Sequence, residues 1–176
     1  MKGVIVCCLS LLVKERFGSD TWGKILEENG LNKETVFLPT ENVDDKVVIN
    51  LVKSVCSHLK ISLEQAADAF GDYWMTAYAP KVYSAFFIGK KTARDFILSL
   101  DNIHLITTQT MDGASPPRFE YLDHNENSLT MKYFSKREMF EFFKGLLKGI
   151  GKYYNEQLII NDVGKNTVKI TFHKRI

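Results

Sequence analysis

Apolar residues in the first part of the chain recur at helical spacing. Residues 3–17 are apolar on nearly every side, which predicts a helix enclosed by other elements. A second helix is expected over residues 20–29, with Ser19 as its cap, and a third begins at Asp44 and Asp45. These patterns predict that the N-terminal part of the chain is helical.

Two further helices are predicted from their polar starting residues. Ser62 and Gln65 form a capping box, in which each side chain bonds the backbone N–H of the other residue. This helix is expected to end just before Pro80. Thr92 predicts a similar cap for a shorter helix over about residues 93–100.

The pattern changes to strict alternation in the last third of the chain. Residues 119–122 and 129–133 alternate between apolar and polar side chains, which predicts a β-hairpin. A second hairpin is expected from strands over 154–160 and 167–173, joined by a turn at 161–164.

An amphipathic helix is predicted between the two hairpins. A capping box of Ser135 and Glu138 marks its start, and apolar residues follow at positions 139, 142, 143, 146, 147 and 150. The predicted fold class is therefore α+β, with a helical N-terminal lobe of about residues 1–80. This lobe is expected to pack on a mixed lobe of about residues 81–176, whose antiparallel sheet has about four strands.

Composition narrows the class of protein. The chain is 45% hydrophobic and 25% charged, which is typical of a globular protein, and its net charge of +2 gives no reason to expect a nucleic-acid partner. Aromatic residues make up 12%, including 12 phenylalanines. This aromatic content indicates that something large and apolar is packed inside.

The cysteines and the N-terminal run indicate the compartment. Cys7, Cys8 and Cys56 are an odd number and form no disulfide framework, so a reducing cytoplasm is expected. Residues 4–13 imitate a short signal peptide, but no cleavage site follows, and the run is too short to span a bilayer. We expect a cytoplasmic protein without stable membrane insertion.

His104 is the histidine in the most apolar surroundings, between Ile103 and Leu105. Such a histidine is either a hydrogen-bonded core residue or a metal ligand, and its neighbours alone leave both possibilities open. The sequence contains no phosphate-binding loop, zinc-protease motif or nucleophile elbow. It therefore gives no basis for predicting an enzyme.

The motif Tyr133-x-Ser135-x-Arg137 lies where a strand is expected to end and a helix to begin. It has a purely structural interpretation, in which Tyr133 packs on the sheet and Ser135 caps the helix. However, a cation in the first turn opposes the helix dipole, which favours an anionic partner for Arg137. Two hydroxyls and a forked guanidinium are suited to binding carboxylates.

These residues together resemble the H-NOX (haem nitric oxide/oxygen binding) family, whose type of sensor domain is also found in soluble guanylate cyclase. His104 precedes Tyr133 by 29 positions, and Pro117 follows His104 by thirteen. The opening Met1-Lys-Gly3 before an apolar helix is also typical of this family. The likeness extends over essentially the whole chain.

The resemblance implies a single domain over residues 1–176 that binds haem b between its two lobes. In that family the histidine is the proximal iron ligand, which here implies His104 as the metal ligand. The proline presses on the haem, which implies this role for Pro117. The motif binds the haem propionates, which implies that role for Tyr133, Ser135 and Arg137.

The resemblance also implies which residues line the distal face, namely Ile5, Phe142 and Leu146. In oxygen-binding relatives a distal tyrosine lies nine residues after the tyrosine of the motif. Phe142 occupies that position here and cannot donate a hydrogen bond, which bound O2 needs more than NO does. We therefore expect a ferrous haem that binds NO and CO and excludes O2.

The family suggests how such a protein signals. NO weakens or breaks the bond from iron to His104, the haem relaxes from a distortion maintained by Pro117, residues 101–106 shift and the lobes rotate. The signal is expected to pass to a separate histidine kinase or cyclic-di-GMP enzyme. Two alternatives stay open: an O2 or redox sensor of the same fold, and a cofactor-free adaptor or small-lipid binder.

Overall fold

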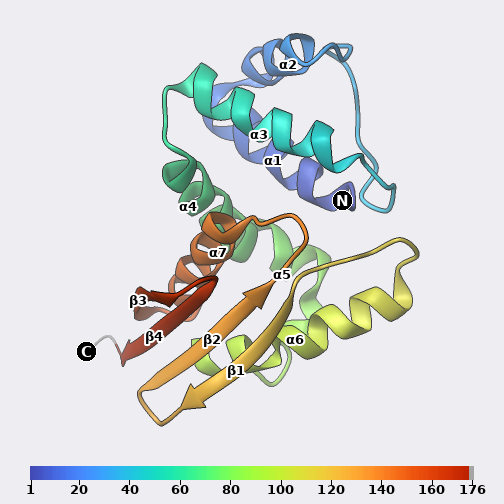
Figure 1. Ribbon diagram of the computed structural model, residues 1–176. Helices are drawn as coiled ribbons and strands as arrows, with labels where there is room; N and C mark the ends of the chain where they lie inside the picture. Colours follow the sequence, from blue (N-terminus) through green and yellow to red (C-terminus); the bar gives the residue numbers. More distant parts are fainter. Residues whose placement is uncertain (175–176) are drawn as a thin grey trace. The chain divides into compact units, whose positions relative to one another are not determined.

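A computed structural model describes residues 1–174 and contains helices followed by a mixed α/β region (Figure 1). The helical part consists of α1 (Val4–Phe17), α2 (Ser19–Glu28), α3 (Asp45–Leu59), α4 (Leu63–Tyr73), the π-helix η1 (Trp74–Tyr78), α5 (Ala79–Val82), the 3₁₀ helix η2 (Ser84–Phe87) and α6 (Ala93–Thr110). The rest consists of β1 (Arg118–His124), β2 (Ser128–Phe134), α7 (Phe140–Tyr153), β3 (Glu156–Gly164) and β4 (Thr167–Lys174). The predicted α+β class is confirmed.

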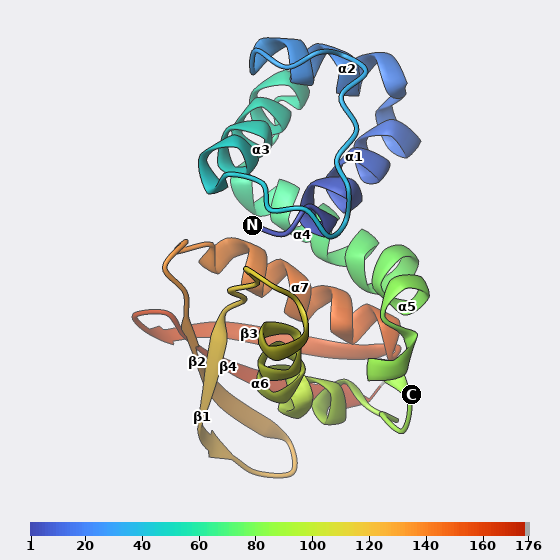
Figure 2. The same cartoon turned by 90° about the vertical axis from the view of Figure 1, so that its right-hand side faces the viewer.

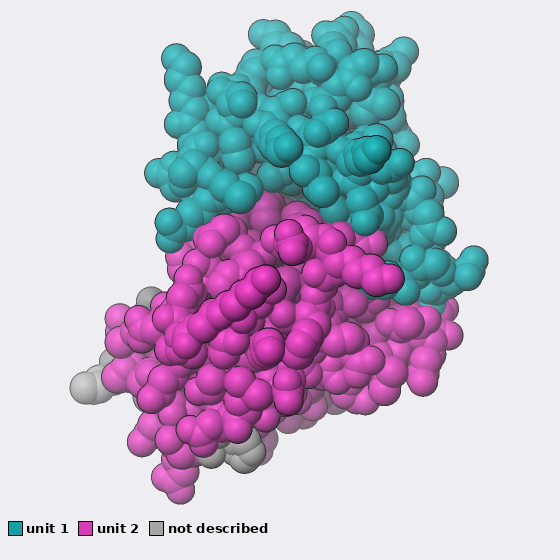
Figure 3. Space-filling model, in the orientation of Figure 1, with its two compact units in different colours: residues 1–66, 111–115 teal, residues 67–110, 116–176 magenta. Residues whose placement is uncertain are grey.

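The chain divides into two compact units (Figure 3). Unit 1 consists of Met1–Ala66 and the short segment Met111–Ser115. Unit 2 consists of Ala67–Thr110 and the chain from Pro116 onward.

Unit 1 is built from α1, α2 and α3 around an apolar core. Its most deeply buried side chains are Val6, Cys8, Val13, Trp22, Ile25, Leu26, Val48 and Leu51. The start of the chain is fixed on this unit, because the Gly3 N–H donates to the carbonyl of Glu41 (2.9 Å). A Cβ atom at Gly3 would collide with the carbonyl oxygen of Leu38, so only glycine fits here.

Unit 2 is built around a four-stranded antiparallel sheet with the strand order β1-β2-β4-β3. One face of the sheet packs against α6 and α7 (Figures 1 and 2). The shared core consists of Ile97 from α6, Leu147 and Ile150 from α7, and Leu129, Met131, Val168 and Ile170 from the strands. The alternation in the two hairpins therefore separates core residues from solvent-facing ones, as predicted.

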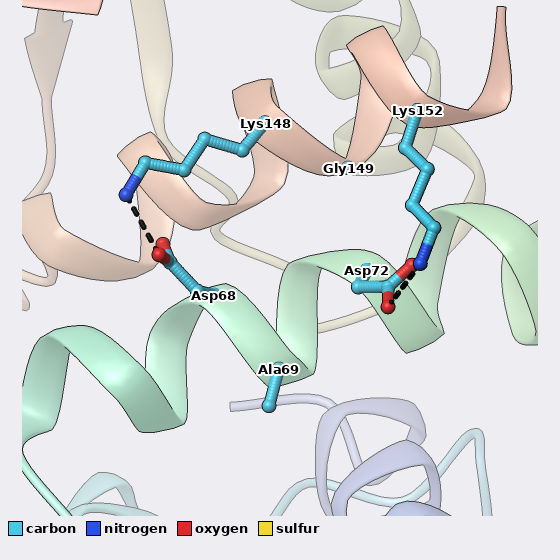
Figure 4. Close-up of a pocket in the computed structure, with 6 residues that line it drawn as sticks. All are labelled: Asp68, Ala69, Asp72, Lys148, Gly149 and Lys152. Carbon is cyan, nitrogen blue, oxygen red and sulfur yellow. Dashed lines mark hydrogen bonds and ion pairs between the residues drawn. The ribbon is translucent and has the colours of Figure 1, made fainter. Parts of the chain in front are cut away.

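The helices α4 and α7 cross at unusually close range within unit 2. A Cβ atom at Gly71 would collide with the Gly145 carbonyl, and one at Gly145 would collide with the Ala67 carbonyl. Two ion pairs of 2.7 Å flank the crossing, Lys148 with Asp68 and Lys152 with Asp72 (Figure 4). They border a shallow hollow of about 320 Å³.

Two predicted caps are confirmed. The Ser62 N–H donates to the Gln65 side chain (2.8 Å), and the Gln65 N–H donates to the Ser62 hydroxyl (3.1 Å). At the start of α6, the Asp95 N–H donates to the Thr92 hydroxyl at 3.0 Å. The predicted cap at Ser19 is wrong, because Ser19 is the first residue of α2 and makes no capping bond.

The predicted end of a helix near residue 100 is wrong, because α6 continues to Thr110 and His104 lies inside it. Short polar side chains such as those of Asp101 and Asn102 often bond local backbone groups and so disfavour a helix interior. The Asp101 carboxylate instead accepts hydrogen bonds from Arg118 and from the Phe119 N–H. It therefore does not compete with the helix.

The predicted capping box at residues 135–138 is also wrong. The Ser135 hydroxyl accepts a hydrogen bond from the Arg137 N–H (3.2 Å) within a turn. Glu138 has a left-handed φ of 51°, so the chain cannot enter a helix there, and α7 begins at Phe140. Arg137 therefore lies in a turn before α7, and the helix-dipole argument for an anionic partner fails.

Two smaller boundaries also differ from the prediction. One helix was expected to end just before Pro80. In the structure, α4 ends at Tyr73, and the chain continues through the π-helix η1 into α5, which contains Pro80. The turn of the second hairpin is not at residues 161–164, because Asn161 and Asp162 pair with β4. The strands instead turn between Gly164 and Thr167.

Candidate functional site

His104 is held by a hydrogen bond between its Nδ1 atom and the carbonyl oxygen of Pro117, at 2.7 Å. A carbonyl only accepts, so Nδ1 must carry the proton of this bond, and in a neutral imidazole the lone pair then lies on Nε2. Burial lowers the pKa of His104, and the bond to Pro117 partly opposes this shift. Metal-binding histidines are commonly oriented in this way, through the ring nitrogen that does not bind the metal.

A second set of bonds fixes the segment that contains Pro117. The Arg118 guanidinium donates to both oxygens of the Asp101 carboxylate, at 2.8 and 2.6 Å, and the Phe119 N–H donates to the same carboxylate at 2.8 Å. The hydrogen bonds from Arg118 lower the pKa of Asp101. Asp101 and His104 are three residues apart, so they share one face of α6.

The sequence interpretation did not identify Asp101 as part of this site. The spacing of Asp101 and His104 would have indicated a shared helical face if the helix had been predicted to continue. Instead, Asp101 was assigned to the end of the helix.

The three residues of the motif come together at the end of β2. Tyr133 is buried in the sheet, and its ring stacks on Phe143 at 5.1 Å. Burial raises the pKa of Tyr133, whereas a hydrogen bond with Ser135 and the charge of Arg137 lower it. The turn over residues 135–139 is therefore what places these hydroxyl and guanidinium groups together.

Phe142 lies on the first turns of α7 and is buried against aromatic rings of unit 2. It contacts Phe70 edge-on, with ring centroids 5.4 Å apart, and Phe70 stacks on Trp74 at 5.7 Å. Leu146 lies one turn later on α7 and is half-buried. Ile5 is half-buried in α1, within unit 1.

The donors in unit 2 fit a haem better than a bare metal ion. Among residues 1–174, no group of three or more His, Cys, Asp or Glu side chains is placed to hold a metal. A haem needs only one axial ligand from the protein, because the porphyrin supplies the other four nitrogens, and its propionates need hydrogen-bond donors. His104 and the residues of the motif match these two needs.

Searching the described part of the chain, from residue 1 to 174, reveals no helix that is long and apolar enough to cross a membrane. All three cysteines, Cys7, Cys8 and Cys56, are free thiols. Burial raises the pKa of each of them.

The model of one protein family, described as Haem-NO-binding (HNOB), matches residues 2–162. Two soluble guanylate cyclases of Caenorhabditis elegans, gcy-32 and gcy-34, are each 24% identical over 157 residues. These matches cover 86% of this chain but only 23% of the length of each cyclase.

Solved H-NOX structures have the same fold. An oxygen-binding H-NOX domain related to soluble guanylate cyclases, crystallised as its oxygen complex, is 26% identical with a TM-score of 0.84. That match covers 98% of this chain and 95% of the other. A mutant H-NOX of T. Tengcongensis is 24% identical and has a TM-score of 0.86, with 100% of each chain covered.

Proposed function

Because this chain belongs to the Haem-NO-binding family, we propose that it is a gas sensor that binds NO and CO at ferrous haem b and excludes O2. The observation that supports this most strongly is the bond from His104 Nδ1 to Pro117, which leaves Nε2 as the ligand atom. We propose that residues 1–176 act as one sensor domain without catalytic activity of its own.

His104 is proposed to hold the iron through Nε2, with its ring kept in position by the Pro117 carbonyl. Tyr133, Ser135 and Arg137 are proposed to donate hydrogen bonds to the propionates. The haem would supply the open axial position at which a diatomic gas binds. The side chains of this protein around that position then determine which gas binds.

Phe142 is the proposed basis for excluding O2. Its ring has no donor, and it packs against Phe70 with the ring centroids 5.4 Å apart, so its surroundings are apolar. We propose that Leu146 lines the distal face together with Phe142. Ile5 of α1 is also proposed to line the distal face, as the sequence predicts. NO and CO depend less than O2 on a hydrogen bond, so they bind without one.

An O2 sensor is the second candidate, and one contact favours it. Trp74 carries an indole N–H and stacks on Phe70, the ring that contacts Phe142. Trp74 thus supplies an indole donor to the ring cluster that contains Phe142. A thiol-based redox sensor has less support, because burial raises the pKa of all three cysteines and so disfavours the reactive thiolate.

The proposed signal depends on the link between His104 and Pro117. If Nε2 is released, Nδ1 still bonds the Pro117 carbonyl, so a displacement of α6 would pull on the segment before β1. We propose that a separate histidine kinase or cyclic-di-GMP enzyme detects this change. The free cysteines are consistent with the cytoplasm as the compartment.

The test is the visible absorption spectrum of the haem-loaded ferrous chain, first under argon and then with O2, CO or NO. We expect the Soret band to shift with CO and with NO and to show no oxygen adduct in air-saturated buffer. A stable oxygen adduct would support the second candidate. A chain that retains no haem after reconstitution would contradict both.

A further inference from the structure

The connection between α5 and α6 combines exposed apolar residues with an excess of positive charge. Figure 2 shows this connection at the margin of unit 2. Residues 81–94 contain four cations, Lys81, Lys90, Lys91 and Arg94, and no carboxylate. In a chain with 23 basic and 21 acidic residues, a run of this kind is a local concentration of charge.

A tight turn presents the apolar part of this segment to solvent. Ile88 has φ −61° and ψ 129°, Gly89 has φ 77°, and the Lys90 N–H donates to the Phe87 carbonyl at 3.2 Å. These values define a type II turn with Ile88 and Gly89 at its centre. Ile88 is 77% exposed at the apex.

The base of the turn is anchored, so the apex has a fixed position on unit 2. The ring of Phe87 lies 4.7 Å from that of Phe96 and 5.0 Å from that of Tyr153. Val82, just before the turn, is 48% exposed. The segment thus buries Phe87 while it exposes Val82 and Ile88.

Carboxylates offset only part of the charge of the lysines around this turn, because the charge of Lys90 acts on the nearby Asp95 carboxylate. Lys81, Lys90 and Lys91 form no ion pair with any of the residues that the structure describes. Asp95 accepts from the N–H groups of Lys91 and Thr92, both at 3.1 Å. Asp95 therefore bonds the backbone at the start of α6 and offsets part of the charge of Lys90, while Lys81 and Lys91 keep the segment positive.

We propose that this segment, residues 81–91, docks the protein reversibly on an anionic membrane surface, with Ile88 entering the headgroup boundary. An apolar apex beside a segment with net positive charge complements such a surface, where each lysine contributes about 1 kcal/mol, or roughly fivefold in affinity. A specific protein interface needs about 800 Å² from each partner, far more than two exposed aliphatic side chains supply. The proposal is independent of haem binding.

The test is co-sedimentation of the full chain with vesicles, made either of phosphatidylcholine alone or of phosphatidylcholine mixed with phosphatidylglycerol. We expect binding to the mixed vesicles at low salt, little binding to phosphatidylcholine alone, and release at high salt. Ile88→Asp and the double variant Lys90→Glu/Lys91→Glu are each expected to weaken binding about tenfold or more.

Matched variants in unit 1 provide the controls. Val36 is also 77% exposed, so Val36→Asp makes the same change on unit 1, and Lys24→Glu/Lys53→Glu makes the same change of charge there. Both controls are expected to bind like the wild type. The proposal is overturned if the wild type stays in the supernatant, as it would if the segment faced a protein partner, or if the controls lose as much binding.

Discussion

The Nδ1 atom of His104 lies 2.7 Å from the carbonyl oxygen of Pro117, thirteen residues later in the chain. This bond joins the middle of α6 to the segment that leads into β1. The pairing of Arg118 with Asp101 joins the same two segments a second time. Any displacement of His104 would therefore be transmitted to the residues before β1.

Replacing His104 by glycine removes the proposed axial ligand and leaves a space of imidazole size. We expect His104→Gly to lose haem during purification and to regain it when imidazole is added to the buffer. Absorption spectra of the variant with and without imidazole measure this. A five-coordinate ferrous spectrum in the variant without imidazole would contradict the assignment.

Phe142→Tyr introduces a donor at the proposed gas-binding side. A net hydrogen bond is worth about 1 kcal/mol or somewhat more, so we expect O2 affinity to rise about tenfold, with little change for CO. Flash photolysis with each gas measures both. Phe17→Tyr, on an exposed phenylalanine of α1, is the matched control and should leave both affinities unchanged.

Gly145→Ala tests the close crossing of α4 and α7. The added Cβ atom collides with the Ala67 carbonyl, and separating two packed helices costs about 1–3 kcal/mol. This corresponds to a fall of roughly 2–12 °C in Tm, measured by thermal unfolding. Gly23→Ala in α2 is the control: its Cβ would meet nothing nearer than 3.5 Å, so helix propensity should make it stabilising.

The buried hydroxyl of Tyr121 is expected to make the protein less stable in alkaline solution. Its hydroxyl donates to the Ile97 carbonyl (2.6 Å), and burial raises its pKa to about 12. The folded state therefore keeps this proton between about pH 10 and pH 12, whereas the unfolded state loses it. The free energy of unfolding should then fall by up to about 1.4 kcal/mol per pH unit for this group.

Urea unfolding across this pH range measures the effect. Tyr121→Phe should be less stable at neutral pH, because the Ile97 carbonyl loses its donor, but its stability should fall less steeply above pH 10. Equal slopes in the wild type and Tyr121→Phe would refute the role of Tyr121.

The sequence predicted the fold well where periodicity and core packing agree. The alternation around Met131 and the helical spacing of Phe143, Leu147 and Ile150 both correspond to residues of one buried core. The boundaries were less predictable where a side chain bonds a distant partner. Asp101 looked like a helix end, and only its tertiary contact with Arg118 explains why α6 continues.

For the candidate site, the sequence identified candidate residues but not the contacts that position them. Spacing related His104 to Tyr133 through a resemblance, but it did not reveal the bond from His104 to Pro117, because a carbonyl has no signature in sequence. The sequence placed Arg137 in the first turn of a helix, but α7 begins only at Phe140. The left-handed backbone of Glu138 stops it, and a non-glycine residue gives little warning of that conformation.

The central claim is that Nε2 of His104 binds the haem iron. The most direct measurement is the resonance Raman spectrum of the ferrous chain, prepared with ordinary and with ¹⁵N-labelled histidine. We predict an iron–nitrogen stretching band that shifts when the histidines of the wild type are labelled. In labelled His104→Gly supplied with unlabelled imidazole, the band is expected to remain at its unlabelled frequency. A band that is insensitive to the label, or that still shifts with it in the variant, would contradict the account.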